Sequence, residues 1–153
     1  MIVISPHNDD LLIGFFSLIK KGQIKYAYFL ELESDMKEEE AKKFCKDTGI
    51  EIVDQVRFSQ LLVEGIPVII PSPESNHPTH KNIRGWLVMN YEIPLNNIYF
   101  YSTDMKEFWI RLLSKEEQGH KRALLDSYFP LEKDLWASDN KYFLFEGVIK
   151  CCG

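Results

Sequence analysis

The segment that decides the fold spans residues 2–22 and reads IVISPHNDDLLIGFFSLIKKG. Residues 2–5 form a short apolar run that Pro6 ends, which is typical of a fully buried strand. Over residues 9–21 the apolar side chains recur at helical spacing, and Gly22 supplies the stop. The segment therefore predicts a buried strand that leads directly into a helix.

The same alternation of strands and helices continues along the chain. Further strands are predicted over residues 24–32, 50–58, 66–70, 97–101 and 142–149, and further helices over residues 36–47, from about 79 through 89, and over 114–128. Strands that alternate with helices require crossover connections, which favour a mainly parallel sheet. We therefore expect one domain over residues 1–153, an α/β Rossmann-like three-layer sandwich.

Composition limits the classes of function. The chain has 153 residues, 45% of them apolar and 27% charged, as in a soluble globular domain. Its net charge of −5 argues against a nucleic acid as partner. The longest apolar stretch, residues 11–19, holds nine residues and is too short to span a bilayer. We therefore expect a small-molecule substrate and no transmembrane segment.

The cysteines indicate a cellular compartment. Cys45, Cys151 and Cys152 make an odd number, with two adjacent, which does not resemble a disulfide framework. This pattern is typical of a reducing compartment, and no basic leader precedes the first strand. The sequence therefore predicts a cytoplasmic protein. It leaves the oligomeric state open, a homo-oligomer included.

Ligand-type residues gather in two short motifs. His7-Asn8-Asp9-Asp10 follows the first predicted strand, and His77-Pro78-Thr79-His80 follows a later one. In open α/β sheets, ligands bind beyond the carboxyl ends of the strands. We therefore expect both motifs at the same edge of the sheet.

These residue types suit a hydrolytic metal site. Three nitrogen and oxygen ligands with one open position are typical of catalytic zinc, and His7, Asp10 and His80 are the candidates. Asp9 is positioned to act as the general base. His77 is the candidate to stabilise the oxyanion and to protonate the leaving amine.

Each motif alone also has a structural interpretation. Asp9 and Asp10 could only cap the following helix, and His77 and His80 could be ordinary loop histidines. Their joint occurrence at one predicted sheet edge favours the metal site. His120, in contrast, is expected on a partly solvated helix face with Lys121 and Arg122.

The first motif and its flanks resemble a known family. Residues 2–10, followed by LLIGFFSLIKKG, look like the opening of the PIG-L (LmbE-like) family of zinc-dependent N-acetylglucosaminyl deacetylases, which carries His-Pro-Asp-Asp there. The family's second signature, His-Pro-Asp-His, is similar to residues 77–80. Residues 36–50, 120–128 and 142–148 resemble its charged helix, its Lys-x-x-Ala-Leu helix and its closing strand.

The resemblance implies both a function and a set of residue roles. It implies that His7, Asp10 and His80 bind Zn²⁺ (Fe²⁺ or another divalent transition metal could occupy the same kind of site). Asp9 would be the general base and His77 would polarise the carbonyl. Lys37 falls near a family arginine that contacts substrate. The implied reaction is removal of an acetyl or other acyl group from an N-acetylated amino sugar or sugar conjugate.

The chain departs from the family pattern at several positions. Asn8 replaces the usual Pro, Leu11 replaces a frequent acid, and Thr79 replaces the Asp that would raise the basicity of the catalytic histidine. Thr79 favours an alternative, a Rossmann-like binding or scaffold protein with weak or lost activity. A metal phosphoesterase is a further alternative, although the sequence has no second ligand set and no Gly-rich phosphate loop.

Overall fold

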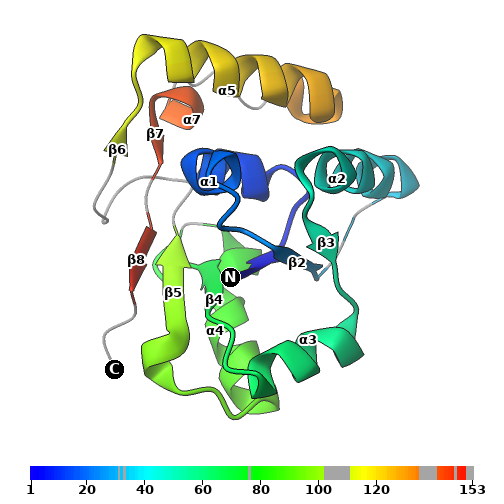
Figure 1. Ribbon diagram of the computed structural model, residues 1–153, viewed down its shortest axis with the longest axis vertical. Helices are drawn as coiled ribbons and strands as arrows, with labels where there is room; N and C mark the ends of the chain where they lie inside the picture. The colour runs from blue at the N-terminus through cyan, green and yellow to red at the C-terminus, as the bar shows by residue number, and fades with distance from the viewer. Residues whose placement is uncertain are drawn as a thin grey trace.

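The computed structural model describes residues 1–30, 32, 34–75, 77–101, 111–134, 141–146 and 148–150. Its centre is a six-stranded sheet in the order β3-β2-β1-β4-β5-β8 (Figure 1). The strands are β1 (Ile2–Ser5), β2 (Tyr26–Phe29), β3 (Glu51–Ile52), β4 (Val68–Pro71), β5 (Ile98–Tyr101) and β8 (Val148–Lys150). The first five run parallel to their neighbours, and β8 runs antiparallel to β5. The mainly parallel sheet that the sequence predicts is confirmed.

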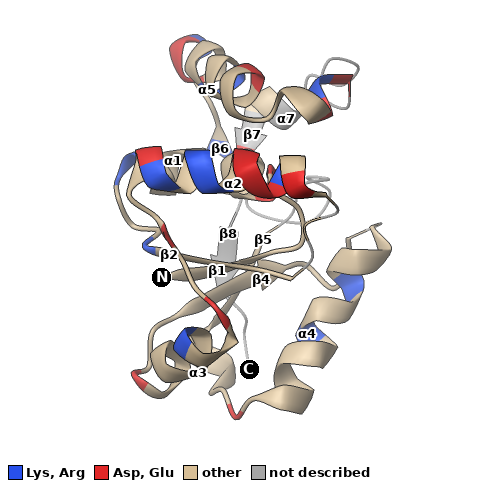
Figure 2. Cartoon of the chain, turned by 90° about the vertical axis from the view of Figure 1, so that its right-hand side faces the viewer, with Lys and Arg blue, Asp and Glu red and all other residues tan. Residues whose placement is uncertain are grey.

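Helices cover both faces of this sheet. They are α1 (Asp10–Lys20), α2 (Asp35–Thr48), α3 (Gln55–Val63), α4 (Pro78–Asn90), α5 (Lys115–Tyr128) and the short α7 (Lys141–Leu144). α1 and α2 pack on one face, against alternate strand residues such as Val3, while α3 and α4 pack on the other, against Ile2 and Ile4 (Figures 1 and 2). The Rossmann-like three-layer sandwich is thus confirmed. No helix among the described residues is long and apolar enough to cross a membrane.

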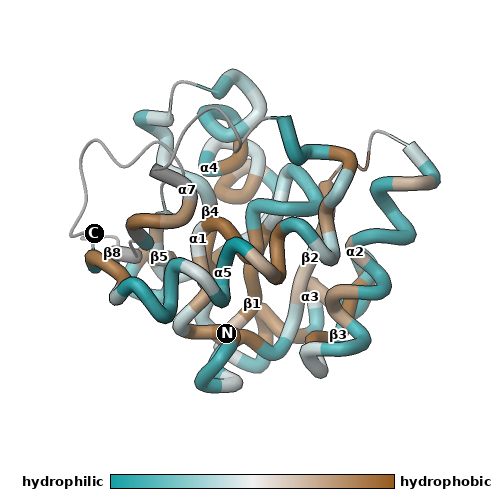
Figure 3. Tube along the Cα trace, turned by 90° about the horizontal axis from the view of Figure 1, so that it is seen from above, coloured by the Kyte–Doolittle hydropathy of each residue, from teal (hydrophilic) through white to brown (hydrophobic). Residues whose placement is uncertain are grey.

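A further layer lies outside α1. α5 packs on the outer side of α1 and α2, and the two-stranded sheet of β6 (Arg111–Leu112) and β7 (Phe145–Glu146) lies beside it (Figure 1). Every residue of α1 from Asp10 to Ser17 is consequently buried. A helix that is apolar all round is expected where both of its sides are covered. In Figure 3 the hydrophobic colour is concentrated around β1 and α1, whereas α2 is mostly hydrophilic.

Side chains at the helix starts explain where several helices begin. Ser34, Asp54 and Ser114 each accept a hydrogen bond from a backbone N–H of the first helical turn, at 3.3, 2.8 and 3.2 Å. Each bond satisfies a donor that has no partner within the helix. α2 ends at Gly49, whose φ of 71° is the left-handed conformation that favours glycine.

Three of the predicted strands differ from the observed ones. Residues 24–32 contain only the four-residue β2, and the prediction of one strand over 50–58 is wrong, because β3 covers two residues and α3 begins at Gln55. Phe58 and Leu61, three residues apart, are the buried positions of α3, so the apolar residues serve a helix face. The described residues of 142–149 are divided among α7, β7 and β8, because α7 and β7 lie in the outer layer and β8 lies in the central sheet.

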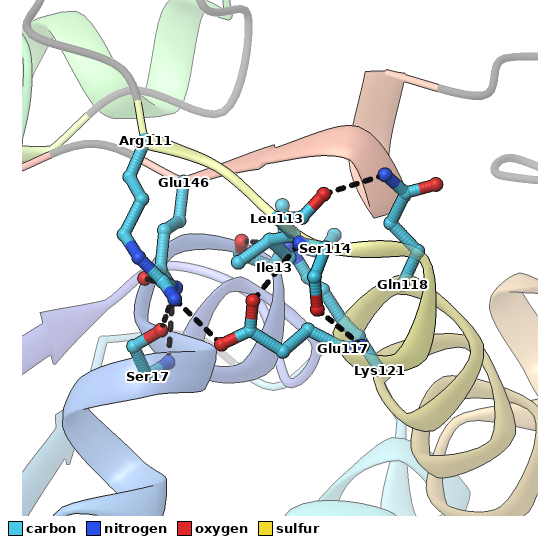
Figure 4. A network of polar contacts seen from close by, with 9 residues as sticks. All are labelled: Ile13, Ser17, Arg111, Leu113, Ser114, Glu117, Gln118, Lys121 and Glu146. Atoms are coloured by element: carbon cyan, nitrogen blue, oxygen red, sulfur yellow. Dashed lines mark hydrogen bonds and ion pairs between the residues drawn. The ribbon is translucent and has the colours of Figure 1, made fainter.

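Buried charges surround a kink in α1 (Figure 4). Phe15 departs from helical geometry, with φ of −130° and ψ of 21°. Lys121 Nζ donates to the carbonyl of Ile13 at 2.6 Å, and the N–H of Ser17 donates to Glu146 Oε2 at 2.8 Å. In a regular helix, the N–H of Ser17 would instead donate to the carbonyl of Ile13, four residues earlier. The expectation of a partly solvated Lys121 is wrong, since its exposed fraction is 0%.

Burial lowers the pKa of Lys121 from 10.5 to about 7, although the charge of Glu146 opposes this shift. Between these two pH values the unfolded chain binds more protons, so the free energy of unfolding rises with pH. We expect this rise to reach up to about 1.4 kcal/mol per pH unit and to be absent from Lys121→Met. Urea unfolding of both proteins at pH 7, 8 and 9 measures it. Equal pH dependence in the two proteins would contradict the assignment.

Candidate metal centre

The two ligand motifs lie on neighbouring strands. β1 pairs directly with β4, with Ile2 opposite Val68 and Val3 opposite Ile69. The chain continues from β1 to β2 and β3 on one side and returns to β4 and β5 on the other, so the strand order reverses between β1 and β4. Ligands of Rossmann-like sheets bind beyond the carboxyl ends of the strands at this switch point. Both motifs follow the carboxyl ends of these strands.

Three side chains form a close triangle there. His7 Nδ1 lies 3.1 Å from Asp10 Oδ2, His80 Nε2 lies 3.4 Å from the same oxygen, and the two nitrogens are 3.3 Å apart. The backbone N–H of His7 also donates to Asp10 Oδ2 at 3.1 Å. The structure therefore brings together all three residues that the sequence suggests as metal ligands.

The size of this triangle fits a tetrahedral ion. Ligand atoms about 2.0–2.1 Å from a tetrahedral Zn²⁺ are about 3.3–3.4 Å from one another. The three measured separations, 3.1, 3.3 and 3.4 Å, lie close to that value. The donor set of two imidazoles and a carboxylate is also one that zinc accepts.

A serine orients the buried histidine. Ser75 Oγ lies 3.3 Å from His80 Nδ1 and accepts the backbone N–H of His77 at 3.2 Å. If Nε2 gives its lone pair to a metal ion, Nδ1 carries the proton and can donate it to Ser75 Oγ. Such second contacts fix the tautomer of ligating histidines. The sequence has no signal for Ser75, which is one of two serines in the Pro-rich loop over residues 71–78.

His77 stands at the exposed side of the triangle. It precedes the first turn of α4, and its ring centroid lies 4.7 Å from that of His7 and 4.9 Å from that of His80. The possible ligand atoms of the three histidines all lie within 4.8 Å of one another. The structure thus also allows a three-histidine ligand set, in which His77 replaces Asp10.

Asp9 lies buried beside the triangle, with 4% of its surface exposed. It occupies the N-cap position of α1, yet its side chain makes no capping hydrogen bond. Helix capping therefore does not explain this aspartate. Burial raises the pKa of Asp9 to about 8, and the charges of Asp10 and Glu132 add to the shift. For Asp10 the effect of burial is outweighed by hydrogen bonds from His7 and His80, which lower its pKa.

Glu40 and Lys37 of α2 form polar contacts with Asn8, next to His7, and with the segment that follows α5. Asn8 Nδ2 donates to Glu40 Oε2 at 2.6 Å, and Glu40 Oε1 accepts the N–H of Leu131 at 3.2 Å. Lys37, the expected substrate contact, forms an ion pair with Glu132 at 2.5 Å. Sequence reasoning did not find Glu40, because its role depends on a partner 32 residues away.

Tyr101, at the end of β5, is a further buried neighbour that the sequence did not suggest. Its ring lies against Gly14 of α1, where an added Cβ would be 3.0 Å from Tyr101 Cδ2, and its centroid is 6.4 Å from that of His80. Burial raises the pKa of its hydroxyl, and the charges of Asp10 and Asp9 add to this. Within the described part of the chain, this hydroxyl has no hydrogen-bond partner.

Comparison with known proteins identifies no family for this chain. No protein-family model matches the chain, no curated protein matches it, and no solved structure matches it. The functional interpretation therefore depends on the geometry described above and on the motifs themselves.

The triangle predicts a specific loss of metal binding. We expect His80→Ala and Asp10→Asn to lose Zn²⁺, while His120→Ala, an exposed histidine on α5, keeps it. At a free zinc concentration of 100 times Kd, binding should raise the free energy of unfolding by about 2.7 kcal/mol. Zinc content and thermal unfolding measure both effects. Retention of zinc by Asp10→Asn with loss in His77→Ala would instead favour the three-histidine set.

The hydroxyl of Tyr101 predicts an unusual gain in stability. A buried polar group without a partner costs about 1–3 kcal/mol, so Tyr101→Phe should stabilise the metal-free chain by about 1 kcal/mol. Tyr128→Phe is the matched control, because Tyr128 Oη donates to Asp47 at 2.9 Å and its loss should not stabilise. Denaturant unfolding of metal-free protein distinguishes the two, and a destabilised Tyr101→Phe would show that the hydroxyl has a partner.

Proposed function

We propose that this chain is a metal-dependent amidohydrolase that removes an acyl group from an N-acylated amino sugar. The observation that carries the proposal is the triangle of His7, Asp10 and His80, whose dimensions fit a single tetrahedral ion. The resemblance of the two motifs to the PIG-L family supports the reaction and the sugar substrate.

In this proposal His7, Asp10 and His80 hold the metal, with zinc as the first candidate. When bound, such an ion lowers the pKa of a coordinated water to about 7 and polarises the carbonyl oxygen of an amide. The exposed side of the triangle, where His77 stands, is the side from which substrate would approach.

Asp9 takes the proton of the attacking water. It is buried next to Asp10 and is not used as a helix cap, so its carboxylate is available. A divalent cation at the centre would favour the charged carboxylate, which the metal-free surroundings disfavour. The water oxygen then forms a bond to the carbonyl carbon.

His77 gives its proton to the leaving nitrogen. The carbon–nitrogen bond breaks, and the products are a carboxylic acid and a free amine. Thr79 stands where the family carries the Asp that raises the basicity of the catalytic histidine, and its hydroxyl brings no charge to this part of the site. This feature favours slow turnover and keeps a binding protein with the same fold as the second candidate.

Asp9→Asn separates these two functions. We expect it to keep its zinc and to lose amide hydrolysis by a factor of about 10²–10⁴, the usual contribution of a general base. Zinc content and release of acetate from N-acetylglucosamine measure the two properties. Asp126→Asn, a change of the same type on the exposed side of α5, should leave both intact. A zinc-loaded wild-type chain without turnover would favour the binding protein.

A further inference from the structure

Two buried charged side chains of the outer layer bind α1, although the proposed reaction uses neither of them. Lys121 of α5 has an exposed fraction of 0%, and Glu146 of β7 has one of 7%. Burying a charged side chain is costly unless it is paired or hydrogen-bonded. Apolar side chains of similar volume are often at least as stabilising in such positions. Packing of the outer layer on α1 therefore does not explain these two residues.

Both charged groups bind at the kink of α1 (Figure 4). Lys121 Nζ donates to the carbonyl of Ile13 at 2.6 Å. Glu146 Oε2 accepts the N–H of Ser17 at 2.8 Å. Phe15, between these two positions, has non-helical φ and ψ. Sharp kinks arise where a side chain inserts into the hydrogen-bond ladder of a helix, so the two outer-layer side chains hold α1 in its kinked form.

The peptide group of Ile13 connects the kink to the candidate metal centre. Its N–H donates to the carbonyl of Asp9 at 3.0 Å, and the same carbonyl accepts the N–H of Leu12 at 3.0 Å. Asp9 and Ile13 thus belong to one hydrogen-bonded turn, which also holds the candidate ligand Asp10. The bond from Lys121 therefore fixes one end of a turn whose other end lies in the metal centre.

The central sheet restricts the same turn. A Cβ at Gly14 would lie 3.0 Å from Tyr101 Cδ2, so the backbone that follows Ile13 packs directly on this ring. Tyr101 ends β5 of the central sheet, whereas Lys121 lies in the outer layer. The first turn of α1 is thus held from both sides. Side chains that bind a metal need to be held within about 0.5 Å of their working positions, which requires supports of this kind.

Loss of an outer-layer contact favours a straighter helix. Without Lys121, the carbonyl of Ile13 is buried without this donor, and the N–H of Ser17 is the group that would restore a regular helical turn. Restoring that turn moves the first turn of α1 relative to the rest of the helix, and Asp10 moves with it. The triangle of candidate ligands, whose sides of 3.1, 3.3 and 3.4 Å fit an ion, would then change its shape.

We propose that Lys121 and Glu146 are positioning residues of the metal centre, which hold α1 in the kinked form that presents Asp10 to the ion. The outer layer would thus set the metal affinity of a site to which these two side chains donate no ligand. This inference rests on the proposed function for the metal centre alone, and it is independent of amide hydrolysis and of the sugar.

The zinc affinity of the folded chain tests the inference. We expect Lys121→Met to raise the Kd for Zn²⁺ about tenfold, the lower end of the range for groups that orient metal ligands. Leu124→Ala is the control, because it removes apolar packing from the same helix and no polar contact with α1. It should lower the free energy of unfolding and leave the Kd unchanged. Competition with a chelator measures the Kd, and urea unfolding measures the stability.

Variants of Glu146 separate hydrogen bonding from charge. Glutamine keeps an oxygen that can accept the N–H of Ser17, so Glu146→Gln should keep most of the zinc affinity. Glu146→Leu should weaken zinc binding about tenfold. Co²⁺ bound in place of Zn²⁺ adds a measure of geometry, because its visible absorption depends on the arrangement of the ligand atoms. We expect altered absorption in Lys121→Met and Glu146→Leu, and the wild-type absorption in Leu124→Ala.

Several results overturn the inference. An unchanged Kd in Lys121→Met, or an equal increase in Leu124→Ala, would each do so. If Lys121→Met does not fold, equal zinc affinity of Glu146→Leu and Glu146→Gln overturns it instead. Weaker zinc binding in Lys121→Met, with no hydrolysis by the zinc-loaded wild-type chain, would reject the proposed reaction alone. Hydrolysis by the wild-type chain with an unchanged Kd in Lys121→Met would reject this inference alone, and a wild-type chain that binds no zinc would reject both.

Discussion

The parallel pairing of β1 with β4 is the constraint on which the candidate site depends. It places the carboxyl ends of the two strands one interstrand spacing apart, about 4.8 Å. The turn after β1 carries His7 and Asp10, and the loop and helix after β4 carry His80. With another strand between them, the two imidazoles could not approach to 3.3 Å. The reversal of strand order at this point also leaves the space in which a ligand can lie.

The position of α1 depends on a second layer outside it. α5 covers the outer side of α1, so α1 is buried from Asp10 to Ser17. The start of this helix holds Asp9 and Asp10 at the edge of the sheet. The kink at Phe15 leaves backbone groups that Lys121 and Glu146 engage from the outer layer. Burying these charged groups costs free energy, which their hydrogen bonds to the helix offset in part. The outer layer therefore supports the candidate metal centre, although none of its described residues belongs to the triangle.

The polar groups of the centre are arranged for a positive charge. Asp10 accepts from two imidazoles, while Asp9 beside it has its pKa raised by burial and by the neighbouring carboxylates. Tyr101 and Asn8 each present a buried oxygen that has no partner within the described residues. A buried carboxylate such as that of Asp9, with unpaired oxygen atoms nearby, is costly without a positive charge. The burial of these polar groups adds to the support that the triangle gives to the proposed metal.

Local patterns in the sequence determined the alternation of strands and helices, the start of α1 after a buried strand, and the two motifs with their carboxylates and imidazoles. These features depend on neighbouring residues, whose spacing and turn chemistry are visible along the chain. The same patterns failed for α3, because the apolar residues of a short segment suit a strand as well as a helix face and only packing on the sheet decides between them.

Only the tertiary structure decided the rest. The contact of Glu40 with Asn8, the burial of Lys121, the place of Tyr101 under Gly14 and the closeness of His7 to His80 all join segments distant in sequence. Such contacts follow from strand order and layer packing, which no local spacing encodes. The sequence thus determined which chemical groups the site has, and the fold decided that they meet, because pairing between distant strands sets the distances.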